Sequence, residues 1–314
     1  MLRCPRKTKI KMPCSSLAPI RVGDRSQQVL ILQKGLRNAG LQVNSTGFFD
    51  GQTNFAVRNW QQRNGWFPDG IATQEMLDAL AGDRKSGMNP PPDHDFRGFG
   101  FLGSVPTSQW NMTCLGGQAY PPASMSVSGL GKNFILRLET GGVPSLTDHL
   151  HFPGGLSGVT LGPGYDMKKR SEDDISQQMT AIGVDVKTAL EISSASGLEG
   201  DDAKKFARDN KDLVNLSDAQ QIQLLDTYLP KYSTDVRRQV HTPLLQCEFD
   251  ALVSFAVNSA GNLGRVAQSI RLGEVKEAMT WILRSVGSNM SVKGGLMHRR
   301  QKEIRLYLYG QYSA

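Results

Sequence analysis

The sequence predicts a mainly helical protein of two domains, of which the second also carries a small β-hairpin. Its 314 residues exceed the usual length of one compact domain. Apolar residues recur at a spacing of three to four in both halves, which is typical of helices with one buried face. Clusters of glycine, proline and serine interrupt this periodicity between the halves and again within the second half.

Composition narrows the class of protein. No apolar stretch approaches the ~20 residues that span a bilayer, so we expect no stable membrane insertion. The formal net charge of +7 favours an anionic partner. Nucleic acid is not the expected partner, because the sequence has no reading helix, aromatic ladder or zinc motif.

Residues 1–19 are expected to form a flexible basic tail. Their charges are interspersed with Ile10, Met12 and Pro13, so the tail lacks the uninterrupted apolar run of a secretory signal. We therefore expect synthesis in the cytoplasm without a signal peptide. The basic residues of the tail are Arg3, Arg6, Lys7, Lys9 and Lys11.

Cysteine spacing predicts no metal site and no disulfide framework. Cys4, Cys14, Cys114 and Cys247 form no CxxC pair and have no partnering histidine motif. We expect free thiols, with a Cys4–Cys14 pair as the alternative in an oxidising compartment. No cofactor is expected.

The first domain is expected over residues 20–82. Val29, Leu32 and Leu36 line one face of a helix that Gly40 ends, and a second helix fits 53–63. The ordered motifs LQxxL, TxxAVxxWQ and DGIA resemble the three-helix peptidoglycan-binding domain of cell-wall hydrolases. We expect the apolar residues to serve packing, so that ligand contact falls to exposed loop residues, with Trp66 and the Asp69–Gly70 turn as candidates.

A Gly/Pro-rich linker, or an irregular wrap over the next domain, is expected over 83–124. The second domain then occupies 125–314, with helical patterns at 175–190, 201–210, 218–228 and 249–258. Between them, the stretch GLSGVTLGPGYDM predicts a tight hairpin, because its glycines permit sharp turns.

Glu139 is the first candidate catalytic residue. It ends a helix whose buried face includes Phe134, Ile135 and Leu138. Helix C-termini favour cations, so an acid beside an apolar stripe has an environment suited to proton donation. Glycosidic cleavage needs a second carboxyl group, and Asp166 of the hairpin supplies one, with the Thr160 hydroxyl placed to orient water.

Four segments in order, FILRLE, GVTLGPGYD, FDALVSFAVNSAGNLG and GGLMHRRQKEIRLYLYG, resemble the phage-type lysozyme superfamily and its pesticin lysozyme-like domains. The resemblance spans about 125–310. It implies an α+β lysozyme-like fold in which Glu139 donates the proton, Asp166 is the second carboxylate and Thr160 lies in the cleft. Asp148 is the alternative second carboxylate, and Asn258 is implied at the floor of the cleft, to contact substrate or cap its helix.

The C-terminal pattern predicts a helix in which Arg299, Arg300 and Glu303 form ion pairs at helical spacing. The resemblance implies that the arginine pair supports the lobe that closes over the sugar chain.

Together with the candidate residues, the two resemblances imply a muramidase that cleaves the β-1,4 bond between N-acetylmuramic acid and N-acetylglucosamine in bacterial peptidoglycan. The alternative is a non-catalytic peptidoglycan-binding protein with a degenerate lysozyme fold. A phage endolysin, a secreted antibacterial toxin with an immunity protein and a delivery apparatus, and a host remodelling enzyme all fit the sequence.

Overall fold

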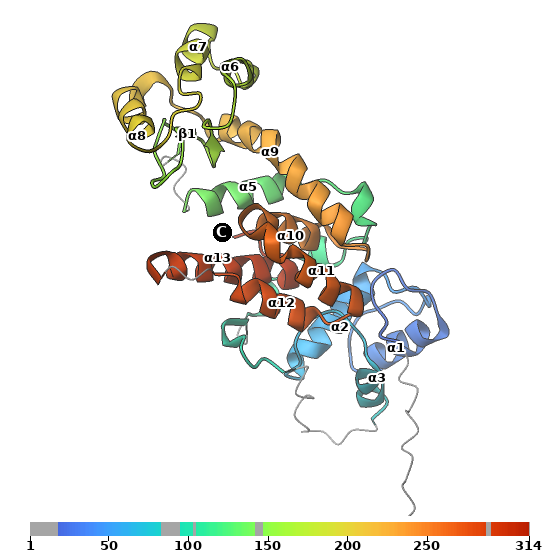
Figure 1. Cartoon of the computed structure of the whole chain (residues 1–314). Helices are drawn as coiled ribbons and strands as arrows, with labels where there is room; N and C mark the ends of the chain where they lie inside the picture. The colour runs from blue at the N-terminus through green and yellow to red at the C-terminus, as the bar shows by residue number, and fades with distance from the viewer. Residues whose placement is uncertain (1–17, 83–94, 103–104, 142–146, 287–289, 314) are drawn as a thin grey trace, which may run out of the picture. The chain divides into compact units, whose positions relative to one another are not determined.

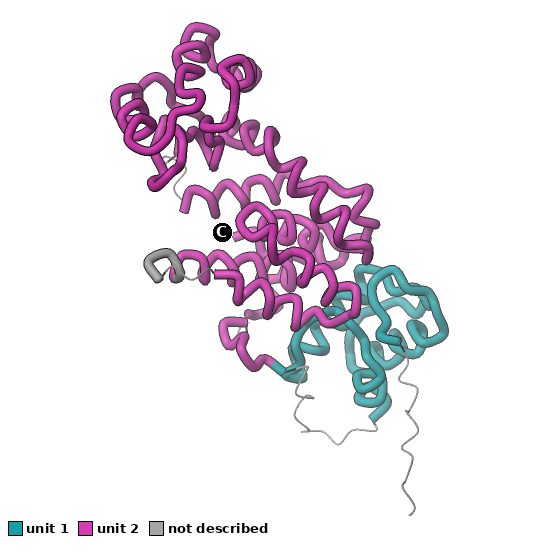
Figure 2. The backbone as a smooth tube through the Cα atoms, viewed as in Figure 1, with its two compact units in different colours: residues 1–95 teal, residues 96–314 magenta. Residues whose placement is uncertain are grey.

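The structure, a computed structural model, describes residues 18–82, 95–102, 105–141, 147–286 and 290–313. The chain divides into two compact units, residues 1–95 and 96–314 (Figures 1 and 2). The described residues are mostly helical and include one two-stranded sheet, which confirms the predicted class. The basic tail lies almost wholly outside these residues, as do Cys4 and Cys14.

The described residues of the first unit form three helices, α1 (Gln27–Asn38), α2 (Gly51–Arg63) and α3 (Gln74–Leu80). Side-chain caps begin the first two, since Ser26 accepts a hydrogen bond from the Val29 N–H at 3.2 Å and Asp50 from the Thr53 N–H at 2.8 Å. The predicted apolar stripe of α1 is fully buried in the core of this unit, against side chains of α2 and of the loops.

The loop residues expected to face a ligand in this unit are buried instead. Trp66 is 4% exposed and packs edge-on against Trp60, with ring centroids 5.4 Å apart. Asp69 is 6% exposed, and its carboxylate accepts a hydrogen bond from Gln61 at 2.6 Å. Gly70 has a φ of +77°, and a Cβ there would lie 2.4 Å from the Asn54 side chain. The expectation of exposure was wrong because this loop folds onto α2 and shares the small core.

The second unit begins with short helices, continues with a hairpin and ends with a set of longer helices. In chain order its elements are η2 (Gly100–Leu102), η3 (Thr107–Gln109), α4 (Met112–Leu115), η4 (Pro122–Ser124), α5 (Gly129–Glu139), β1 (Thr160–Leu161), β2 (Tyr165–Asp166), α6 (Glu172–Ala181), α7 (Val186–Ser193), α8 (Gly200–Asp209), η6 (Lys211–Leu213), α9 (Asp218–Gln239), α10 (Gln246–Ser259), η7 (Ala260–Asn262), α11 (Leu263–Leu272), α12 (Val275–Arg284) and α13 (Met290–Tyr309).

Residues 96–124, expected as the second part of the linker, belong to this unit. They include η2, η3, α4 and η4, and a disulfide joins Cys114 of α4 to Cys247 of α10, with Cα atoms 6.1 Å apart. The expectation of free thiols was therefore wrong for this pair. The two cysteines are 133 positions apart, and spacing along the chain does not reveal a contact that the fold creates.

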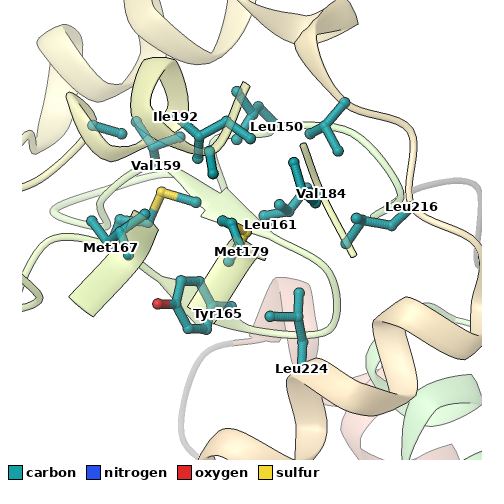
Figure 3. Close-up of a cluster of buried hydrophobic side chains, with 14 of the residues drawn as sticks. Leu150, Val159, Leu161, Tyr165, Met167, Met179, Val184, Ile192, Leu216 and Leu224 are labelled. Atoms are coloured by element: carbon teal, nitrogen blue, oxygen red, sulfur yellow. The ribbon is translucent and has the colours of Figure 1, made fainter. Parts of the chain in front are cut away.

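The predicted hairpin forms from β1 and β2, which pair antiparallel with Thr160 opposite Asp166. Gly162 and Gly164 adopt positive φ angles of 59° and 100° in the turn, which side-chain-bearing residues rarely adopt. The hairpin packs into a cluster of buried side chains shared with α6, α7 and α9, whose labelled members in Figure 3 include Leu161, Met179, Ile192 and Leu224.

Two helical segments differ from the sequence prediction. The pattern at 175–190 is divided between α6 and α7, and Gly183 with φ +87° lies between them. The pattern that begins at 218 continues past Tyr228 as α9, through Pro230, to Gln239. Proline lacks one backbone donor, but the remaining bonds and the burial of Leu225, Leu229 and Val236 keep α9 continuous.

Helix α9 runs between two parts of the second unit. At one end lie the hairpin and α6–α8, and at the other lie α10–α13 (Figure 1). Helix α10 contacts α5, α9, α11 and α13 and is buried from Cys247 to Ala256. Among the described residues, none of the helices has the length and apolar content to cross a bilayer.

Candidate functional site

Glu139 is the last residue of α5, as the sequence predicts. Phe134 and Ile135 on the same helix are buried, which fixes the end of the helix against the core. The Glu139 side chain is 22% exposed, and its Oε1 lies 2.8 Å from Nη1 of Arg299 in α13. This ion pair compensates the unfavourable position of an anion at a helix C-terminus.

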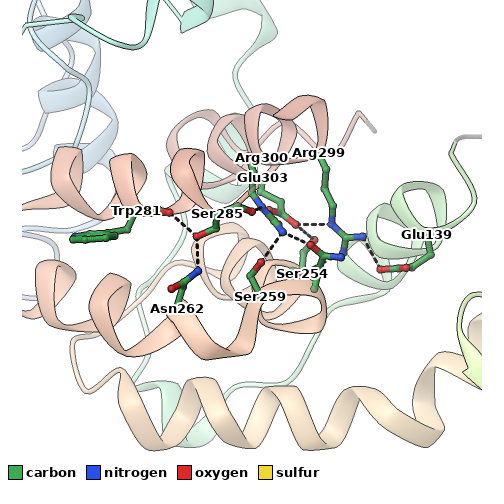
Figure 4. Close-up of polar contacts among 10 residues, drawn as sticks. Glu139, Ser254, Ser259, Asn262, Trp281, Ser285, Arg299, Arg300 and Glu303 are labelled. Carbon is green, nitrogen blue, oxygen red and sulfur yellow. Dashed lines mark hydrogen bonds and ion pairs between the residues drawn. The ribbon is translucent and has the colours of Figure 1, made fainter. Parts of the chain in front are cut away.

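Arg299 also belongs to a second, deeper ion pair (Figure 4). Its Nε lies 3.0 Å from Oε1 of Glu303, and Oε2 of Glu303 accepts a hydrogen bond from Arg300 at 2.5 Å. The Ser254 hydroxyl of α10 donates to Glu303 Oε1 at 2.9 Å. The predicted ion pairs of the C-terminal helix are confirmed, and a single guanidinium bridges Glu139 and Glu303.

Burial alone lowers the pKa of Arg299, but the charges of Glu303 and Glu139 outweigh this effect and raise it. Arg299 is thus held as a cation in a site where only 8% of its side chain is exposed. The network therefore fixes a positive charge next to the Glu139 carboxylate.

Asn258 lies beside this network rather than apart from it. Its Oδ1 accepts a hydrogen bond from Arg300, which also donates to the Ser259 hydroxyl at 2.8 Å and the Ser285 carbonyl at 2.9 Å. Asn258 is itself exposed. The structure brings it together with the arginine pair and gives it no role as a cap of α10, which ends at Ser259.

Thr160 and Asp166 lie opposite each other in the hairpin. Thr160 is 3% exposed, and its hydroxyl lies 3.4 Å from the Gly158 carbonyl. The Asp166 carboxylate accepts hydrogen bonds from the backbone N–H groups of Gly158 at 3.2 Å and Lys168 at 2.8 Å. Through these bonds Asp166 stabilises the hairpin, and its side chain is held in one orientation.

Tyr228 of α9 contacts the hairpin turn, senses the charge of Glu139 and is absent from the sequence-based candidates. Its hydroxyl donates to the carbonyl of Pro163 in the hairpin turn. The pKa of Tyr228 is raised, first by burial and then by the negative charge of Glu139. Tyr228 therefore lies within electrostatic range of Glu139 while it holds the turn. The sequence signal for Tyr228 was its position four residues before Tyr232, which puts both tyrosines on one face of the helix. Their ring centroids are 6.3 Å apart.

Asp148 has different neighbours. Its Oδ1 is buried and lies 3.8 Å from Nε2 of His149, and its carbonyl accepts a hydrogen bond from the Leu216 N–H at 2.8 Å. Among the described residues, these contacts do not join Asp148 to the network around Glu139. Nowhere in the described residues do three histidine, cysteine, aspartate or glutamate side chains lie close enough together to hold a metal ion.

Two family models match the chain, one within each unit. Residues 25–80 match the family described as "Putative peptidoglycan binding domain". The first unit carries a peptidoglycan-binding domain. Residues 142–252 match a domain of unknown function, DUF8812, which covers the hairpin and α6–α9. A comparison with curated protein sequences gives no match.

Two solved structures are similar to the chain at low identity. The muramidase domain of SpmX from Asticaccaulis excentricus is 22% identical, with 58% of this chain and 97% of that chain covered and a TM-score of 0.38. A Burkholderia AP3 phage endolysin is 14% identical, with 91% of this chain and 99% of that chain covered and a TM-score of 0.23.

Proposed function

We propose that the protein is a peptidoglycan hydrolase of the muramidase type, with Glu139 as the proton donor. The observation that carries the proposal is the position of Glu139, partly exposed at the end of α5 and fixed by Arg299. The peptidoglycan-binding domain over 25–80 supports the substrate class, because it would hold the enzyme on the polymer that it cleaves. The lysozyme-type motifs of the second unit support the reaction class.

In this mechanism Glu139 protonates the glycosidic oxygen between N-acetylmuramic acid and N-acetylglucosamine as the bond breaks. Loss of the proton leaves Glu139 as a carboxylate. Arg299 is placed to pair with this carboxylate, because its Nη1 lies 2.8 Å from Oε1 of Glu139. Asp166 is the proposed second carboxylate, which activates water or stabilises the oxocarbenium-like transition state, and Thr160 orients the water. Asn258 is proposed to contact the sugar chain through the side-chain atoms that Arg300 does not engage.

The test of the acid is Glu139→Gln. This variant keeps the shape of the side chain and leaves Arg299 paired with Glu303, so the unit should remain folded. We expect loss of clearing of purified peptidoglycan while binding to the same material persists. Glu191→Gln, on the exposed surface of α7, is the matched control and should lyse normally. Lysis by Glu139→Gln at the wild-type rate refutes the assignment, and an inactive wild-type protein supports the non-catalytic alternative.

The second carboxylate is tested by comparing Asp166→Asn with Asp148→Asn. If Asp166 acts in the reaction, its variant loses far more activity than the change in melting midpoint explains, whereas Asp148→Asn stays active. The reverse result reassigns the role to Asp148. Proton NMR of the first product reports retention or inversion at the anomeric carbon. An immunity protein or a delivery apparatus is the further partner expected of a secreted toxin, and neighbouring genes distinguish that role from a phage endolysin.

A further inference from the structure

A pocket of about 330 Å³ lies between α8 and the strand-like segment that precedes β1. Its floor is apolar, since Leu150 and Ala207 are 2% and 4% exposed and Phe152 packs against the adjoining hydrophobic cluster. Its rim is basic, with Lys204 and Arg208 from α8 and Lys211 just beyond it. The spacing of four places Lys204 and Arg208 on one side of α8, and Lys211 of η6 lines the same pocket.

The pocket carries an excess of positive charge. All eight of its lining residues belong to the described part of the chain, and none of them is acidic. The nearest carboxylate on α8, Asp209, pairs with Arg208 at 2.8 Å and with Lys205 at 2.9 Å. Within the described residues, the ammonium groups of Lys204 and Lys211 have no such partner. Three cations at the rim, against the carboxylates of Asp209 and of Asp148 beside His149, leave an excess of about one positive charge.

His149 and His151 form one wall of the pocket. His149 Nδ1 lies 3.1 Å from the Lys211 carbonyl, and His151 Nδ1 lies 3.1 Å from the His149 carbonyl. Because a carbonyl only accepts, each Nδ1 carries the proton, and both rings are held in one orientation. Asp148 lies 3.8 Å from His149 Nε2, so one carboxylate also stands beside this side of the pocket.

The wall is also rigidly joined to the hairpin. The backbone N–H and carbonyl of His151 both pair with Thr160, each at 2.9 Å. The pocket therefore forms one piece with the β1 strand and its cluster of buried side chains. A ligand held there would be bound by a preformed site rather than by surface lysines alone.

We propose that this pocket binds a phosphate group esterified to a small organic moiety. A phosphate monoester carries about −1.5 to −2 charges at pH 7, and Lys204 and Lys211 of the rim attract such an anion. Lysine and arginine are the usual partners of phosphate oxygens. The volume exceeds that of a bare phosphate, and the apolar floor fits the carbon atoms of a glycerol or sugar. This site is separate from Glu139 and goes beyond hydrolysis, because it would anchor the second unit to a phosphate-bearing polymer or lipid.

The test is a titration of the full-length chain, labelled at its five histidines, with inorganic phosphate and with glycerol 3-phosphate at constant pH and low salt. We expect saturable NMR shifts of His149 and His151, with tighter binding of the ester. Lys204→Gln with Lys211→Gln should weaken binding about tenfold, since two exposed charge contacts are lost. Both lysines are exposed, so this variant should fold.

The matched control removes two other exposed lysines, Lys169 and Lys187, by the same substitution. Equal weakening in the control overturns the proposal, because it would show non-specific attraction to a basic protein. Absence of saturable shifts up to tens of millimolar of either ligand also overturns it. Neither result depends on catalysis, so the pocket and the proposed hydrolase activity fail separately.

Vesicles distinguish the sources of the phosphate. Co-sedimentation with phosphatidylglycerol vesicles that is lost in the Lys204 and Lys211 double variant identifies a lipid headgroup. Retained glycerol 3-phosphate binding without vesicle binding identifies a phosphate-bearing polymer or a free ester. Either result supports a phosphate site.

Discussion

Glu303 is the centre of the buried network, and its replacement by glutamine tests whether that network stabilises the second unit. Glu303 is fully buried and accepts hydrogen bonds from Arg299, Arg300 and Ser254. Glutamine keeps one acceptor oxygen but directs an NH₂ donor at a guanidinium. Arg299 retains Glu139, whereas Arg300 is left with only neutral oxygen acceptors.

The expected cost follows from the burial of both partners. Arg300 and Glu303 are each 0% exposed, so the change leaves a buried charge without its counter-ion. Breaking a buried pair in this way costs about 3–5 kcal/mol. For a unit of this size, each kcal/mol lowers the melting midpoint by about 2–4 °C, so we expect a fall of roughly 6–20 °C.

Differential scanning calorimetry of the full chain measures this shift, with the two units followed as separate transitions. Asp209→Asn, which breaks an exposed pair on α8, is the control and should change the transition little. Replacing Arg300 by Met together with Glu303 by Leu removes both charges and should cost less than Glu303→Gln alone. A shift for Glu303→Gln as small as that for Asp209→Asn would refute the reasoning.

Three further changes test other features of the second unit. Cys114→Ser removes the bridge to Cys247 and should lower the free energy of unfolding in urea by about 2–5 kcal/mol, whereas equal values with and without reductant would contradict this. Burial raises the pKa of Tyr165 to about 12, so the stability linked to its proton is complete below pH 10 and is lost as the pH rises through 12. In Tyr165→Phe the unfolding free energy should therefore fall less at alkaline pH. A pH profile equal to that of the wild type would argue against this. Tyr228→Phe removes the hydrogen bond to Pro163 and should lower the free energy of thermal unfolding by about 1 kcal/mol. It should also reduce peptidoglycan lysis by more than this loss of stability explains. Lysis at the wild-type rate would exclude a positioning role for Tyr228.

Residue patterns within short segments predicted the structural features that depend on neighbouring residues of the same segment. The spacing of Val29, Leu32 and Leu36 identified α1, because the same residues form its buried face. The glycines around Thr160 identified the hairpin, since the turn needs positive φ angles. The ion pairs of Glu303 were predictable because their partners lie three and four positions away on one helix.

Contacts between distant segments were not predictable in this way. Glu139 and Arg299 are brought together by the packing of α5, α10 and α13, so the sequence predicted a carboxylate at the end of α5 but not its partner. Asp166 was predicted from its place in the hairpin and from the family resemblance, whereas its hydrogen bonds to backbone N–H groups depend on a fold that spacing does not describe. Tyr228 was passed over because an aromatic residue on a helix face usually serves packing.

The bridge between α4 and α10 makes a covalent ring of the chain between them. The ring contains the hairpin, α5 to α9 and the proposed phosphate pocket, because its two cysteines are 133 positions apart. A protease that cuts once inside this ring, for example near Leu156, which is 78% exposed, would leave every fragment attached to the same molecule. The nicked protein would migrate as a single species on a non-reducing gel and separate into two fragments only when the bridge is reduced.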